Sequence, residues 1–189
     1  TISGTATGSG TDFTLANGSL TIAAGDTSGA ITIASIVNDA LDEANETVIV
    51  TLTASPTNAA LGSDDAHTYT INDNDDTPSL SIADVTAANE SAVNKTFTVT
   101  LSAAAGRDVT VNYATSNGTA TAGADYTATS GSLTIAAGAT TTTFTVGVLA
   151  DTLAETNETV TLTLSSASNA SISDATATLT ITDDDSSVS

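Results

Sequence analysis

An internal repeat is the feature that most limits how this chain can fold. The octapeptide GSLTIAAG occurs at Gly18 to Gly25 and recurs unchanged at Gly131 to Gly138, an offset of 113 residues (131 − 18). Three further pairs of segments keep the same order in both halves: GTATGSGTDF with GTATAGADY, NETV with NETV, and INDND with ITDDD. A period of about 110 residues is too long for one coil of a β-solenoid but suits an immunoglobulin-sized β-sandwich. Two copies of one such module are therefore predicted.

Residue composition and alternation both favour β-strands over helices. The apolar residues are mainly Ala, Val, Leu and Ile interleaved with Thr, and aromatic residues make up only 3% of the chain. Phe144, Val146 and Val148 occupy alternate positions, which places them on one face of a strand. The expected fold is all-β, with tandem Ig-like antiparallel sandwiches. In the second copy the predicted strands are Ser79 to Val85, Thr96 to Ser102, Asp108 to Thr115, Ser132 to Ala136, Thr142 to Ala150, Thr159 to Ser165 and Ala175 to Thr182.

The repeat also predicts the domain boundaries. Residues 1–76 form a partial copy that lacks its N-terminal strands, residues 77–185 form a complete copy, and residues 186–189 begin a following repeat or a tail. Half a sandwich leaves an open apolar face and unpaired strand edges, so residues 1–76 are not expected to fold alone. Two explanations stay open: upstream sequence was trimmed from a longer array, or another chain donates the missing strands.

The charge balance excludes several partners. The chain carries 22 acidic residues against Lys95 and Arg107 alone, a net charge of −20, which argues against nucleic acid and anionic membranes as partners. No apolar run approaches the roughly 20 residues of a membrane span, and the N-terminus has no signal-like block, so any targeting signal is expected outside these residues. Soluble cations are the natural counterions. There is no Cys, so neither a disulfide framework nor a thiolate metal site can form.

Acidic residues follow several of the predicted strands of the second copy. The predicted topology places these strand ends at the same end of the sandwich. The last strand runs into three adjacent carboxylates, in which Asp183 and Asp185 continue the inward face while Asp184 points the other way. Two such charges about 4 Å apart repel by roughly 4 kcal/mol at an effective dielectric constant near 20. A calcium ion would relieve this repulsion, because calcium accepts 6 to 8 oxygen ligands in flexible geometry. The other candidates at this end are Glu90, Asp125, Asp151 and Glu155.

The motifs TATAGADY, LADTLAETNETV and ITDDD, in this order and spacing, closely resemble the Calx-beta domain family, and the resemblance extends over the whole chain. The resemblance implies calcium ligands from a Glu after the first strand, the Asp of the DY loop, an acidic element ending in Glu, and the terminal Asp run. In the second copy these are Glu90, Asp125, Asp151, Glu155, Asp183, Asp184 and Asp185. In the first copy they are Asp12, Asp39, Glu43, Asp73 and Asp75, with Asn38 and Asn74 as neutral oxygen donors. The family's first Asp of a pair is Ala150 in the second copy and Asn38 in the first, so fewer ions per domain are expected.

An enzyme is not expected. His67 is the only His in the chain, and with no Cys there is no basis for a Ser-His-Asp or Cys-His mechanism. Paired carboxylates occur in glycosidases, but this chain has too few aromatic residues to build a sugar platform.

The expected function is a calcium-binding structural module of a repetitive extracellular protein, a bacterial adhesin or surface filament whose partners are the neighbouring repeats. Calcium would stiffen the junction, since DNDDTPSL leaves almost no flexible residues between the copies. A calcium-sensing regulatory tandem, as in sodium/calcium exchangers, is the alternative from another class. A third possibility is an accessory module of a larger secreted enzyme.

Overall fold

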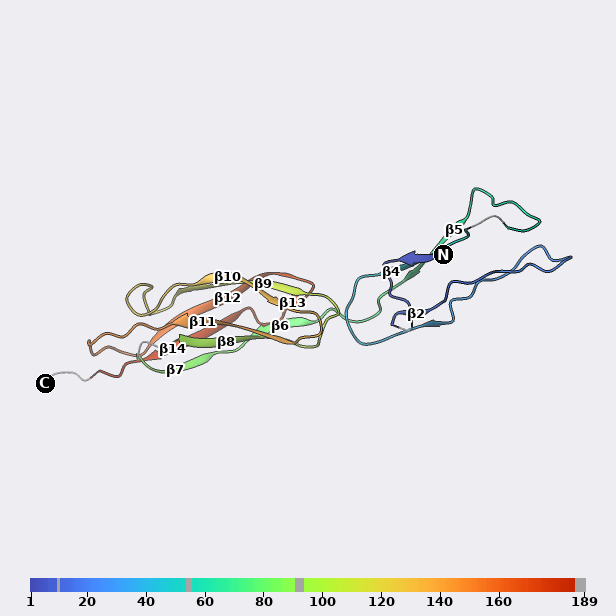
Figure 1. Ribbon diagram of the computed structural model, residues 1–189. Helices are drawn as coiled ribbons and strands as arrows, with labels where there is room; N and C mark the ends of the chain where they lie inside the picture. Colours follow the sequence, from blue (N-terminus) through green and yellow to red (C-terminus); the bar gives the residue numbers. More distant parts are fainter. Residues whose placement is uncertain (10, 54–55, 91–93, 186–189) are drawn as a thin grey trace. The chain divides into compact units, whose positions relative to one another are not determined.

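Strands are the only regular elements in the described part of the structure, a computed structural model that describes residues 1–9, 11–53, 56–90 and 94–185. The all-β prediction is therefore confirmed. The strands form two units, Thr1–Asp75 (unit 1) and Asp76–Ser189 (unit 2) (Figure 1). No helix among the described residues has the length and apolarity that a membrane crossing requires.

Unit 2 is a sandwich of two sheets. Neighbouring strands pair antiparallel, except that β13 pairs parallel with β6 and β14 pairs parallel with β7. One sheet has the order β10 (Ser130–Ile135), β9 (Val109–Asn117), β12 (Glu158–Ser168), β14 (Thr176–Thr182) and β7 (Val85–Asn89). The other has the order β11 (Thr141–Gly147), β8 (Asn94–Leu101), β6 (Ser79–Ile82) and β13 (Ser171–Ile172).

The prediction of one strand from Ser79 to Val85 is wrong. The structure divides it into β6 and β7, which belong to opposite sheets. The backbone N–H of Thr178 in β14 donates a 2.8 Å hydrogen bond to Asp84 Oδ1, which ties the start of β7 to its neighbour β14 in the five-stranded sheet. The chain thus crosses between the sheets within two residues. The short strand β13 was not predicted either, whereas the other six strands lie within a few residues of their predicted bounds.

The core of unit 2 follows from strict alternation along the strands. In β8 and β11 the exposed residues after Asn94 are all Thr, and the intervening Phe97, Val99, Phe144 and Val146 are buried. Phe144 stacks on Phe97 with ring centroids 5.4 Å apart and on Tyr113 with centroids 4.1 Å apart. Burying each large apolar side chain contributes roughly 1.5–3 kcal/mol. The sandwich thereby becomes a rigid support for the loops at its ends.

Unit 1 contains only part of this architecture. One sheet has the order β1 (Ile2–Gly4), β4 (Glu46–Thr51) and β5 (Ala66–Ile71), and β2 (Phe13–Thr14) pairs with β3 (Ser35–Ile36). Among its described residues, Phe13 and Val48 are the buried apolar side chains. No described strand of unit 1 corresponds to β6, β7 or β8.

Replacing Phe97 by Ala should destabilise unit 2 by about 3–5 kcal/mol, because the fully buried ring leaves a cavity beside Phe144. Urea unfolding followed by far-UV circular dichroism measures the change. Thr98→Ala, one residue along the same strand and exposed, is the matched control and should shift stability by about 0.5 kcal/mol or less. Equal effects of the two substitutions would contradict the assigned register of β8.

Candidate metal centre

Parallel pairing of β7 with β14 brings the first acidic residues together. Thr182, the last residue of β14, pairs with Asn89, the last residue of β7. Glu90 follows Asn89, and Asp183 follows Thr182. Because parallel strands end at the same edge of a sheet, the two carboxylates leave the sandwich at one end. This end of unit 2 is called the acidic pole.

Glu90, Asp183 and Asp185 form one cluster at the acidic pole. Each offers a carboxylate oxygen within 4.8 Å of the others. The backbone N–H of Asp185 donates to Asp183 Oδ1 at 3.4 Å, which curls the segment after β14. Glu90 is buried, and Glu90 Oε2 and Asp185 Oδ2 are enclosed without a hydrogen-bond partner among the described residues. Buried carboxylate oxygens without donors are costly unless a cation binds them.

Asp125, Asp151 and Glu155 form a second cluster, again with oxygens within 4.8 Å of one another. Asp125 lies in the loop before β10, where its Oδ2 accepts a 2.6 Å hydrogen bond from the backbone N–H of Thr121. Asp151 Oδ1 accepts a 2.7 Å bond from the backbone N–H of Leu153, an Asx turn that opens the loop after β11. In each aspartate one oxygen shapes its own loop, so the other can serve as a ligand.

The loop that carries Asp125 is anchored in the core by its neighbour. The Tyr126 ring is buried, and its hydroxyl donates to Asn117 Oδ1 at 2.8 Å. The same Asn117 oxygen accepts a 3.0 Å bond from the backbone N–H of Ala122. These bonds join the end of β9 to both ends of the loop, so Asp125 is held in a fixed position rather than on a free loop tip.

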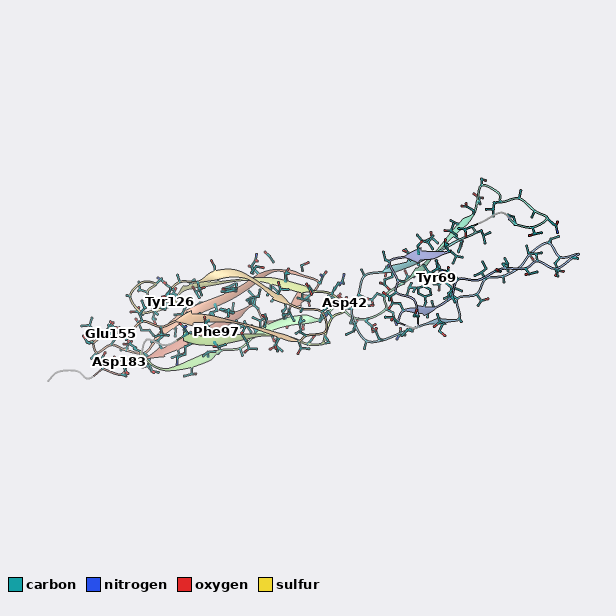
Figure 2. All side chains as sticks on the ribbon, in the orientation of Figure 1. Asp42, Tyr69, Phe97, Tyr126, Glu155 and Asp183 are labelled. Carbon is teal, nitrogen blue, oxygen red and sulfur yellow. The ribbon has the colours of Figure 1, made fainter. Side chains whose placement is uncertain are left out.

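The two clusters share the acidic pole and repel each other. Figure 2 shows Glu155 and Asp183, one from each cluster, at the same end of unit 2. Burial raises the pKa of Glu90, and the charges of Asp151 and Asp183 raise it further. Desolvation and then the charges of Asp151 and Asp125 raise the pKa of Glu155. Burial and the charge of Asp184 likewise raise the pKa of Asp185. All three shifts have the sign expected of crowded and partly desolvated carboxylates.

Glu158 belongs to this site although it was not predicted. Burial, a hydrogen bond to Asp125 and the charge of Asp125 raise the pKa of Glu158 to about 7, and its Oε2 has no hydrogen-bond partner among the described residues. Its counterpart in unit 1, Glu46, also has a raised pKa, from burial and the charge of Asp12. The signal was available in the sequence, because Glu158 and Glu46 are the Glu residues of the repeated NETV motif.

Six of the seven acidic residues predicted for the second copy lie in the two clusters. The exception is Asp184, which is exposed and belongs to neither group. Its orientation away from the inward face agrees with strand alternation past the end of β14.

The five acidic residues predicted for the first copy line one pocket of about 60 Å³ in unit 1. The loop geometry repeats that of unit 2: the N–H of Thr7 donates to Asp12 Oδ2, and the N–H of Leu41 donates to Asp39 Oδ1 at 2.9 Å. Burial and then the charges of Asp39 and Asp12 raise the pKa of Glu43. The other residues that line the pocket are Ile36, Val37, Asn38, Ala44, Glu46, Ile71, Asn72 and Asn74.

Unit 1 gathers its carboxylates less tightly than unit 2. None of its described acidic residues form a group of three with oxygens within 4.8 Å. A physical reason is that the described residues of unit 1 include no counterpart of β7, the strand that delivers Glu90 in unit 2.

The oxygen donors at the acidic pole of unit 2 and in the acidic pocket of unit 1 fit calcium. All candidate ligands are oxygens, the chain has no Cys, and its single His67 lies on β5 outside the acidic pocket. Zinc and copper sites normally include His or Cys, whereas calcium takes carboxylate, amide, backbone carbonyl and water oxygens. The enclosed oxygens of Glu90, Glu158 and Asp185 are the structural feature that a cation would satisfy.

The chain is similar to known proteins in sequence and in fold. A family model described as the Calx-beta domain matches residues 1–75 and 73–185. The crystal structure of the apo form of the Calx CBD1 domain is similar, with a TM-score of 0.54 and 23% identity, over 58% of this chain and 100% of that one. No curated protein sequence matches the chain.

Two longer solved structures are also similar. CBD12 from CALX1.2 aligns with a TM-score of 0.53 and 25% identity, over 56% of this chain and 45% of that one. The calcium binding domain CBD12 of CALX1.1 aligns with a TM-score of 0.53 and 24% identity, over 58% of this chain and 47% of that one. The alignment therefore spans less than half the length of these two chains.

Raised carboxyl pKa values should make the calcium-free protein less stable as the pH increases. Below pH 4.5 Glu158 is protonated in both the folded and the unfolded chain. Between pH 4.5 and about 7 the unfolded chain loses this proton while the folded chain keeps it, so the free energy of unfolding falls. Above about pH 7 Glu158 is ionised in both states, so it no longer makes the free energy of unfolding depend on pH.

Urea titrations in chelator across this pH range measure the effect. The unfolding midpoint should decrease as the pH rises, and Glu158→Gln should flatten the upper part of the decrease because glutamine does not titrate. A midpoint that rises with pH, or a slope unchanged by Glu158→Gln, would refute this description of the acidic pole.

Proposed function

Since the chain belongs to the Calx-beta domain family, we propose that it is a calcium-binding structural module of a repetitive extracellular protein, an adhesin or surface filament. The observation that carries the proposal is the pair of carboxylate clusters at the acidic pole, with enclosed oxygens on Glu90, Glu158 and Asp185. Bound calcium would supply the positive charge that the chain, with only two basic residues, does not provide.

The acidic residues of unit 2 would form two separate calcium sites. Glu90, Asp183 and Asp185 would hold an ion where β7 and β14 end, and Asp125, Asp151 and Glu155 would hold an ion between the loops before β10 and after β11. Each cluster joins segments far apart in sequence. Fixing them together removes loop freedom that the repelling carboxylates would otherwise promote.

The short connection between the units supports a stiffening role. Asp73 and Asp75 line the acidic pocket of unit 1, and β6 of unit 2 begins at Ser79. Only residues 76–78 separate the pocket from the next strand, and one of these is Pro78, which restricts the backbone. An ion bound by Asp73 and Asp75 would order the last residues of unit 1 directly before this connection.

The composition supports an extracellular repeat array. The bias to Thr, Ala and Gly, the near absence of Lys and the lack of Cys suit a secreted repetitive protein whose partners are the adjoining repeats. No catalytic role is proposed.

A calcium-sensing regulatory tandem is the second candidate. Its support is the similarity to the CBD12 structures, one of which is described as a calcium binding domain. An accessory role in a larger secreted enzyme is a third candidate, with no residue that favours it. Flanking sequence separates the three: further repeats indicate an array, membrane spans indicate a sensor, and a catalytic domain indicates an accessory module.

Calcium should raise the stability of unit 2. One independent site at a calcium concentration 100 times its dissociation constant adds roughly 2.7 kcal/mol. Differential scanning calorimetry of the full chain in calcium and in chelator measures the shift. Asp183→Asn combined with Glu155→Gln should abolish the shift of the unit 2 transition, because one charged ligand is lost from each cluster.

The matched control is Asp108→Asn. Asp108 precedes β9 at the end opposite the acidic pole, and Asn can keep the oxygen that accepts the hydrogen bond from the N–H of Ala137. Its calcium shift should equal that of the wild type. If calcium leaves the unit 2 transition unchanged, or shifts the double variant as much as the control, the calcium proposal for these clusters fails.

Calcium should also narrow the range of distances between the two units. Because the chain has no Cys, Thr68→Cys and Thr98→Cys place two spin labels specifically on exposed strand positions, one in each unit. Pulsed dipolar spectroscopy should give a narrower distance distribution in calcium than in chelator. Asp73→Asn with Asp75→Asn should lose the narrowing. A change in the mean distance at constant width of the distribution would favour the calcium-sensing tandem. A distance distribution that calcium leaves unchanged would exclude stiffening of the connection between the units.

A further inference from the structure

The hydroxyl of Tyr126 is a feature of unit 2 that filling the core does not explain. The Tyr126 ring (Figure 2) is 1% exposed, and its hydroxyl donates to Asn117 Oδ1 at 2.8 Å. In unit 1 the aspartate of the same motif is followed by Phe13, which is 2% exposed. A phenyl ring is therefore buried as completely as the tyrosine ring. Because a buried hydroxyl needs a hydrogen-bond partner, its presence in unit 2 points to a role for the bond itself.

Both partners of this bond differ between the two copies. The residue before the GTAT sequence is Asn117 in unit 2 and Ser3 in unit 1. The turn is otherwise closed in the same way, because a threonine hydroxyl of GTAT meets the hydroxyl of a threonine in the adjacent strand at 3.4 Å in both units. These pairs are Thr119 with Thr159 in unit 2 and Thr5 with Thr47 in unit 1. Unit 2 thus adds the bond between Tyr126 and Asn117 to a turn that forms without it.

The backbone around Tyr126 fixes two predicted calcium ligands relative to each other. Tyr126 forms an antiparallel bridge with Val148, directly after β11. The carbonyl oxygen of Asp125 accepts a 2.9 Å hydrogen bond from the backbone N–H of Leu149, and Asp151 follows two residues later. Asp125 and Asp151 both belong to the second cluster. The position of Tyr126 therefore sets the spacing between these two carboxylates.

The spacing and rigidity of carboxylates decide between calcium and magnesium. Calcium accepts oxygens at about 2.3–2.6 Å in flexible geometry, whereas magnesium requires a near-ideal octahedron at about 2.0–2.1 Å. Ligands that are held apart favour the larger ion, while ligands on a loose loop can contract around the smaller one. Asn117 adds to the rigidity, because its Oδ1 also accepts a 3.0 Å bond from the backbone N–H of Ala122 within the loop that leads to Asp125.

We propose that Asn117 and Tyr126 are positioning residues that make the second cluster selective for calcium over magnesium. The inference rests on the calcium proposal and adds to it the specificity of one site. Neither side chain is a carboxylate, so both act through the ligands that they hold in place. Groups that orient metal ligands in this way typically contribute about 10- to 100-fold to metal affinity.

Nuclear magnetic resonance of the full chain measures this site separately from the others. The amide signals of Gly123, Ala124 and Leu153, in the loops of the second cluster, are followed as calcium chloride or magnesium chloride is added. Tyr126→Phe should weaken calcium binding about tenfold or more and magnesium binding less, so the ratio of the two affinities falls. Asn117→Ala should lower this ratio as well. Tyr126→Phe added to Asn117→Ala should change it little further, because both residues act through one bond.

The matched control is Tyr113→Phe. Tyr113 lies on β9, the strand that ends at Asn117, and its hydroxyl has no hydrogen-bond partner among the described residues. This variant should keep the calcium-to-magnesium ratio of the wild type. A second readout does not need a metal: in chelator, hydrogen exchange of amides 121–125 should be about fivefold faster in Tyr126→Phe than in Tyr113→Phe, since one hydrogen bond that holds the loop is lost.

Faster exchange together with a lower calcium-to-magnesium ratio in Tyr126→Phe, and neither change in Tyr113→Phe, supports the proposal. The proposal is overturned if the loop exchanges faster while the ratio stays that of the wild type, because Tyr126 then contributes to stability alone. Unchanged exchange in Tyr126→Phe, or an equal fall of the ratio in the control, overturns it too. A wild-type chain that binds no calcium at these signals contradicts the calcium proposal itself, and the selectivity inference fails with it. A wild type that selects calcium while both variants keep its selectivity contradicts the inference alone.

Discussion

Repulsion among carboxylates that the fold forces together is the interaction on which the rest of the structure depends. Two unit charges about 4 Å apart repel by roughly 4 kcal/mol at an effective dielectric constant near 20. Each cluster of unit 2 holds three acidic residues with carboxylate oxygens within 4.8 Å of one another. Sheet pairing gives these residues little freedom to separate, because Glu90 and Asp183 each follow a strand end fixed in the same parallel pair. The chain offers too few basic residues to balance them. A bound cation is the consistent solution, and oxygen-only donors select calcium.

The two units show how strongly strand formation depends on partners. Tyr69 in unit 1 and Leu179 in unit 2 hold equivalent positions opposite Val48 and Val160, yet Tyr69 is exposed and Leu179 is buried. The local loops, in contrast, are preserved: the hydrogen bonds of Asp12 with Thr7 and of Asp39 with Leu41 repeat those of unit 2. Local turn chemistry survives without the full sandwich, whereas burial and strand pairing do not.

Sequence alone was sufficient for the features that rest on periodicity. The repeat, the alternation of Phe144 and Val146, and the ordered motifs predicted the sandwich and the family, and both predictions are confirmed. The meeting of Glu90 with Asp183 could be expected from topology, but its cause could not, because the sheet switch at Asp84 depends on a long-range bond from Thr178. Glu158 was missed because it begins a strand, although it belongs to the repeated NETV motif; its burial and its hydrogen bond with Asp125 show that it belongs to the site. The ligand assignments themselves stay predictions.

A crystal structure of the chain grown with calcium tests the central claim most directly, because anomalous scattering locates the ion independently of the carboxylates. Peaks should lie between Glu90, Asp183 and Asp185 and between Asp125, Asp151 and Glu155, each with oxygen ligands at about 2.3–2.6 Å. Carboxylates turned outward to solvent at the acidic pole, with no anomalous peak in either cluster at saturating calcium, would contradict the account.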